Sequence, residues 1–174
     1  MTWVLAIVVC LWLAACTAYD LKWREVPPAL TIPPLFGAVL WVVFTRNAGV
    51  ALFIVQLFIL ADVSIRMRGF ANGLQATIFC LALVISPDPW LAATTMLTAY
   101  GIWSVWRLEK MGGADAQVLL ALTLVFGPTI LLPITLTGGV QGLVSLLAKK
   151  KTIPYMVSIL AGMCVFSLMQ SHIQ

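Results

Sequence analysis

Long uncharged runs are the feature that most constrains this chain. The charged residues fall in short clusters, and the stretches between these clusters are 18 to 33 residues long when Asp62 is set aside. A membrane-spanning helix needs roughly 20 consecutive apolar residues. Only 9% of the residues are charged and the mean hydropathy is +1.06, whereas soluble domains carry about 25% charged residues. The chain is therefore predicted to be an all-α polytopic membrane protein, a bundle of transmembrane helices.

The lengths of the runs predict about eight spans. The uncharged runs are residues 1–19, 26–45, 47–65, 69–87, 89–106, 116–148 and 152–174. As one helix, the run 116–148 would be about 50 Å long, which exceeds a hydrocarbon core of about 30 Å. We therefore expect two spans there, with a break either at Gly127-Pro128 or between Pro133 and Gly139.

The basic residues predict the orientation of these spans. Alternating the loops places nine of the ten Lys and Arg residues on one side, namely Lys22, Arg24, Arg66, Arg68, Arg107, Lys110, Lys149, Lys150 and Lys151, and only Arg46 on the other. Lys and Arg collect in cytoplasmic loops, so the N-terminus and the C-terminus are both predicted outside. The net charge of +4 then needs no nucleic-acid partner. The expected partner is the lipid bilayer. Residues 1–174 are expected to form one membrane-embedded domain of a multi-pass cell-membrane protein.

Three of the six acidic residues are candidates for chemistry. Asp88, in a Ser-Pro-Asp-Pro turn, is explained by the turn itself. Asp62 lies four residues before Arg66, so it could be an intramembrane ion site or a carboxylate that pairs with Arg66 at the interface. Asp20 and Asp115 each lie where a predicted span meets the cytoplasm, Asp20 at a helix C-terminus and Asp115 at a helix N-terminus.

Two carboxylates at one membrane depth can act together if their helices pack side by side. One ionised carboxylate can act as general base on water, while a protonated partner hydrogen-bonds the scissile carbonyl, because like charges in contact cannot both stay ionised. The helix dipole favours the ionised form of Asp115 and the protonated form of Asp20. The alternative for Asp115 is a purely structural role as the N-cap of the helix that follows.

Two local motifs resemble those of a known family. The segment Asp20-Leu21-Lys22-Trp23-Arg24-Glu25-Val26-Pro27 resembles the cytoplasmic segment after the first helix of type IV prepilin peptidases, and Gly112-Gly113-Ala114-Asp115 resembles their GxGD signature. Ile153-Pro154-Tyr155 is a weaker third match. The chain is thus similar to bacterial prepilin peptidases and archaeal preflagellin peptidases, which are intramembrane aspartyl proteases.

The resemblance implies an activity and a set of site residues. The protein would remove the short basic leader from pilin-like or archaellin-like precursors at the cytoplasmic face. Asp20 and Asp115 would be the catalytic pair, Gly112 and Gly113 would let the backbone bend and approach the extended substrate, and Arg24 and Pro27 would shape the first cytoplasmic loop. No metal or cofactor is implied, and the cytosolic segment with paired CxxC motifs that accompanies methyl transfer in bifunctional members does not occur, so we expect proteolysis without methyltransferase activity.

Ala114 stands where the signature has its second glycine. If that position required left-handed backbone, an L-residue there would cost about 1 to 2 kcal/mol. The four cysteines all lie inside apolar runs without a CxxC pair, which predicts packing residues, not a zinc site or disulfides.

Two alternatives to a protease are open at this point. A small transporter or channel would use Asp62 as its ion-sensing residue. A non-catalytic relative of the same fold would assist pilus assembly. The sequence leaves the oligomeric state and the specific precursor undefined.

Overall fold

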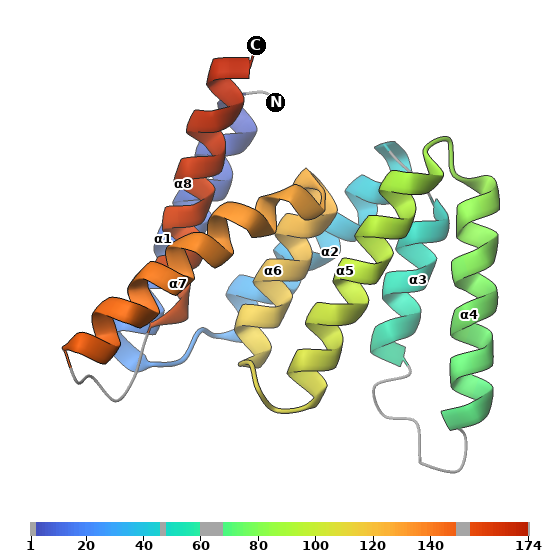
Figure 1. The fold of residues 1–174 in the computed structure, drawn as a ribbon, viewed down its shortest axis with the longest axis horizontal. Coiled ribbons are helices and arrows are strands. Elements are labelled where there is room, and N and C mark those ends of the chain that lie inside the picture. The colour runs from blue at the N-terminus through green and yellow to red at the C-terminus, as the bar shows by residue number, and fades with distance from the viewer. Residues whose placement is uncertain (1–2, 46–47, 60–67, 149–153, 174) are drawn as a thin grey trace. The chain divides into compact units, whose positions relative to one another are not determined.

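The computed structural model describes residues 3–45, 48–59, 68–148 and 154–173, and in these ranges the predicted all-α fold is confirmed. Eight α-helices and one short 3₁₀ helix follow one another, without a strand in the described ranges (Figure 1). The elements are α1 (Trp3–Trp23), α2 (Pro28–Thr45), α3 (Ala48–Ile59), α4 (Arg68–Ile85), α5 (Pro89–Arg107), α6 (Gly113–Phe126), η3 (Pro128–Ile130), α7 (Leu131–Leu147) and α8 (Tyr155–Ile173).

The apolar helices fall into two length classes. Three are long and apolar enough to cross a membrane, namely Val4–Trp23, Pro28–Thr45 and Pro128–Leu147. Four shorter apolar helices cover Ala48–Ile59, Asn72–Ile85, Gly113–Phe126 and Tyr155–Gln170. Large apolar side chains are exposed along α1 and α7, including Val4, Leu11, Leu136 and Val140, as is typical of surfaces in contact with lipid. Three apolar helices of membrane-spanning length are consistent with a membrane protein.

Several residues of the sequence argument lie outside the described ranges. These are Asp62 and the basic residues Arg46, Arg66, Lys149, Lys150 and Lys151. The number of crossings, the orientation and the role of Asp62 stay predictions.

The chain divides into two compact units. Residues 1–32 and 129–174 form the first unit, and residues 33–128 form the second. In the first unit, α8 packs against both α1 and α7; in the second, α3, α4 and α5 pack together and α6 packs on α5 (Figure 1). That the two units make up one domain of residues 1–174 stays a prediction.

A tryptophan of α1 compensates for a proline in α2. Pro33 and Pro34 lie inside α2, and because Pro34 has no N–H, the carbonyl of Leu30 loses its helical donor. The indole Nε1 of Trp12 donates to the Leu30 carbonyl at 2.7 Å. In an apolar environment an unpaired carbonyl would cost several kcal/mol, so this bond ties the start of α2 to α1.

The break in the run 116–148 lies at Gly127-Pro128, the first of the two expected positions. Helix α6 ends at Phe126, and Gly127 has φ 86°, a left-handed conformation that favours glycine. Its N–H still donates to the Thr123 carbonyl at 2.9 Å, and Pro128 cannot continue the helix. The alternative break between Pro133 and Gly139 is wrong, because both residues lie inside α7.

Helices α7 and α8 approach each other at one glycine and share a polar seam. A β-carbon at Gly162 would lie 2.5 Å from the Cα of Ile134. Thr137 Oγ1 donates to the Ser158 carbonyl at 2.8 Å, Gln141 Nε2 donates to the Pro154 carbonyl at 3.0 Å, and Ser158 Oγ donates to Gln141 Oε1. Small residues and interhelical hydrogen bonds of this kind hold helices together in bilayers.

We expect Gly162→Ala to destabilise the first unit by about 1 to 3 kcal/mol, because the added methyl group overlaps the backbone of α7. The measurement is thermal unfolding of the full chain in detergent. Gly139→Ala is the matched control, since a β-carbon there meets nothing within 4 Å. Equal shifts of Tm in the two variants would contradict the close approach at Gly162.

Candidate functional site

Asp20 lies in the last turn of α1, where the helix ends on an unusual residue. The carbonyl of Asp20 accepts a hydrogen bond from the N–H of Arg24 at 3.0 Å. Arg24 has φ 58°, so it closes the helix in the left-handed conformation that glycine commonly supplies. Asp20 is therefore held at the point where the chain leaves α1.

The side chain of Asp20 is half-buried, and one of its oxygens is orphaned. Oδ2 is buried and has no hydrogen-bond partner among the described residues. A carboxylate oxygen in this position loses its water without receiving a donor, which is costly for an ionised group. The arrangement suits a carboxyl group that receives a donor from a ligand.

Aromatic and basic side chains surround this end of α1. The rings of Tyr19 and Trp23 lie 4.7 Å apart between centroids, and Lys22 Nζ lies 4.2 Å from the centroid of the Trp23 ring. Tyr19 and Trp23 are both exposed. Aromatic rings with a basic partner are typical of the interface between hydrocarbon and water, and this cluster has that composition.

A tight turn of five residues joins α5 to α6. Lys110 N–H donates to the Val105 carbonyl at 3.1 Å and Glu109 N–H to the Trp106 carbonyl at 2.9 Å, the paired bonds of a Schellman motif. Glu109, at φ 57°, takes the left-handed position. The turn ends at Gly112, which is the N-cap of α6.

Asp115 lies in the first turn of α6 but is not the N-cap. Gly112 is the N-cap, with extended backbone at φ −62° and ψ 146°, and its carbonyl accepts the first helical bond from Ala116 N–H at 3.1 Å. The alternative in which Asp115 caps the helix is therefore wrong in position. A carboxylate in the first turn is still favoured by the positive end of the helix dipole.

Gly112 leaves room for the carboxylate of Asp115. A β-carbon built on Gly112 would lie 3.1 Å from Asp115 Oδ2, and one built on Gly113 would lie 3.4 Å from Trp106 Nε1. Neither glycine has a positive φ. Gly112 therefore supplies clearance for the acidic side chain, and the sequence argument that these glycines bend the backbone finds no support at either position.

Ala114 is unstrained. It is the second residue of α6, and among the described non-glycine residues only Arg24 and Glu109 have a positive φ. The left-handed backbone that would have strained Ala114 does not occur, because Ala114 lies inside α6. Alanine is the residue with the highest helix propensity, so it suits this position.

Trp106 supports the turn and was missed by the sequence argument. Its ring lies 6.2 Å from that of Phe58, between centroids, and its indole nitrogen lies beside Gly113. Phe58 belongs to the last turn of α3, so the contact depends on how α3 and α5 pack. No local motif could have indicated it.

The remaining site residues have local roles. The carbonyl of Pro27 accepts from Leu30 N–H at 2.9 Å at the start of α2. Asp88 is the N-cap of α5, where its Oδ1 accepts from Leu91 N–H at 3.0 Å, which confirms the turn role expected from the sequence. Asp20 belongs to the first unit and Asp115 to the second, so their pairing stays a prediction.

Comparison of the chain with protein-family models, with curated proteins and with solved structures finds no match.

We expect Arg24→Gly and Glu109→Gly each to raise the free energy of unfolding by about 1 kcal/mol, because glycine relieves the left-handed strain at both helix ends. Chemical denaturation in detergent measures the change. Glu25→Gly, beside Arg24 but without a positive φ, is the control and should not stabilise. Destabilisation by Arg24→Gly would show that its side chain holds the loop through contacts.

Proposed function

We propose that the protein is an intramembrane aspartyl endopeptidase of the prepilin peptidase type. The observation that carries the proposal is the local structure around the two candidate aspartates, each of which lies at a helix end. Asp20 has an orphaned oxygen at the end of α1, and Asp115 lies over a glycine at the start of α6. The resemblance of the two surrounding motifs to those of prepilin peptidases supports the same assignment.

In the proposed reaction the two carboxyl groups take different roles. Ionised Asp115, at the N-terminus of α6, removes a proton from water as the water oxygen attacks the scissile carbonyl carbon. Protonated Asp20 hydrogen-bonds the carbonyl oxygen as negative charge develops there. Collapse of the tetrahedral intermediate breaks the C–N bond, and the leaving nitrogen takes the proton that Asp115 removed from water, which returns Asp115 to its ionised form.

The distribution of charge supports a cytoplasmic site. Arg107 and Lys110 flank the α5–α6 turn, and the start of α4 at Arg68 lies at the same end of the second unit (Figure 1). The α4–α5 turn with Asp88 lies at the opposite end. With the basic end on the cytoplasmic side, the proposal has eight crossings and both termini outside.

The proposed substrates are pilin-like or archaellin-like precursors, cut just before the apolar helix that remains in the bilayer. Gly112 is exposed, and a residue without a side chain at the turn lets an extended peptide approach the backbone beside Asp115. Arg24 and Pro27 shape the loop after α1. The proposal uses carboxylates alone, without a metal, a cofactor or methyl transfer.

We expect Asp20→Asn and Asp115→Asn each to lower the rate of leader removal by about 10²- to 10⁴-fold, the usual range for loss of a general acid or base. The measurement is the mobility shift of a pilin-like precursor co-expressed with each variant. Asp88→Asn is the matched control: asparagine can still cap α5, so activity should persist. Activity retained by either of the first two variants would exclude the aspartyl mechanism.

We expect Gly112→Ala to reduce the cleavage rate about 10- to 100-fold, because the methyl group displaces the Asp115 carboxylate by a few tenths of an ångström or more. Gly113→Ala should have a smaller effect, since its β-carbon makes only an ordinary contact with Trp106. Rates are compared at equal amounts of folded protein. A larger loss in Gly113→Ala than in Gly112→Ala would contradict the assigned clearance.

A further inference from the structure

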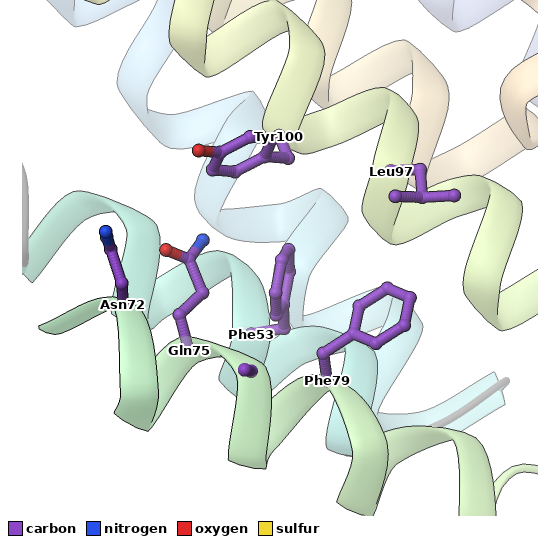
Figure 2. Close-up of a pocket in the computed structure, with 7 residues that line it drawn as sticks. Phe53, Asn72, Gln75, Phe79, Leu97 and Tyr100 are labelled. Atoms are coloured by element: carbon purple, nitrogen blue, oxygen red, sulfur yellow. The ribbon is translucent and has the colours of Figure 1, made fainter. Parts of the chain in front are cut away.

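A pocket of about 300 Å³ lies among α3, α4 and α5, away from the α5–α6 turn. Its wall consists of Phe53, Asn72, Gln75, Ala76, Phe79, Leu97 and Tyr100. The polar ends of Asn72, Gln75 and Tyr100 gather on one side, and Phe79 and Leu97 lie on the other (Figure 2). The volume is at the lower end of the range for small-molecule sites, about 300 to 1,000 Å³.

The polar and apolar sides of the pocket lie at different depths. Asn72 and Gln75 are four and seven residues from the start of α4, and Tyr100 is seven residues before the end of α5. At about 1.5 Å per residue, the polar side lies roughly 6 to 10 Å from the basic end of the unit, and Phe79 and Leu97 lie roughly 15 Å from it. Polarity therefore falls from the basic end toward the middle of the helices.

A ladder of contacts on α5 connects the pocket to a cationic group. The rings of Tyr100 and Trp103 lie 5.7 Å apart between centroids, and the guanidinium carbon of Arg107 lies 5.2 Å from the centroid of the Trp103 ring. The three residues thus share one face of the helix, with the hydroxyl-bearing ring at the pocket and the guanidinium at the helix end.

The pocket also contains an unused donor. Gln75 Nε2 is buried and has no hydrogen-bond partner among the described residues, and the same holds for Nε1 of Trp103, which contacts Tyr100 on α5. An unpaired amide in an apolar environment costs several kcal/mol. A ligand that supplies acceptor oxygens at this depth would remove that cost.

We propose that this pocket binds one anionic glycerophospholipid of the cytoplasmic leaflet. The headgroup region of a leaflet is about 5 to 8 Å thick, so the phosphate lies at the level of Arg107. The ester carbonyls then accept hydrogen bonds from Gln75 and Tyr100 at the polar side. One acyl chain packs against Phe53, Phe79 and Leu97. This binding site is independent of the proteolytic chemistry and requires only that the basic end of the unit face the headgroups.

The test uses the full-length chain in detergent, titrated with phosphatidylglycerol or phosphatidylcholine and followed by native mass spectrometry. The wild type should bind one phosphatidylglycerol at least fivefold more tightly than phosphatidylcholine. Gln75→Leu and Tyr100→Phe should each weaken phosphatidylglycerol binding about tenfold. Arg107→Gln should abolish the preference between the two lipids while retaining binding of both.

Thr77→Val is the matched control, because Thr77 is exposed on α4 and its hydroxyl donates to the Gly73 carbonyl of its own helix. Circular dichroism establishes that each variant is folded. Equal binding of both lipids by the wild type would overturn the proposal, as would losses in Gln75→Leu and Tyr100→Phe no larger than in Thr77→Val. Repeating the titration with Asp115→Asn separates this result from the protease: lipid binding should be unchanged there whether or not the chain cleaves precursors.

Discussion

The helical fold of this chain depends on backbone groups that are satisfied internally, as the proposed membrane surroundings require. In a hydrocarbon solvent, each carbonyl or N–H without a partner costs several kcal/mol. The chain meets this constraint at its interruptions. Trp12 donates to the carbonyl that Pro34 leaves open, Gly127 keeps its bond to Thr123, and the turn after α5 closes with two bonds of a Schellman motif. The helices can therefore stop, bend and restart within a chain that offers few polar side chains.

Much of the fold could be predicted from the sequence because length and apolar content are local properties. Helices formed in every uncharged run, and the long run broke at Gly127-Pro128, where glycine and proline stand together. The helix ends at Arg24 and Glu109 could not be predicted, because neither is a residue that favours left-handed backbone. Their conformations result from the bonds that close the last turns of α1 and α5.

In the candidate site, too, some features could be predicted from the local sequence and others could not. Motif and position indicated Asp20 and Asp115 at helix ends, and both lie there. The reason for glycine at position 112 was not accessible from the sequence, since it depends on where the Asp115 carboxylate points within the first turn. Trp106 was missed for a similar reason, as its contact with Phe58 arises from the packing of α3 against α5. Side-chain direction and helix packing cannot be inferred from sequence patterns.

The seam between α7 and α8 has a consequence for biogenesis. Gln141 and Ser158 satisfy each other and the Pro154 carbonyl only when the two helices are adjacent, and Gly162 allows them to touch. A solitary α7 would present an uncompensated amide to lipid acyl chains. If α7 and α8 enter a bilayer as proposed, they should do so together as a helical hairpin, in which these polar groups shield one another.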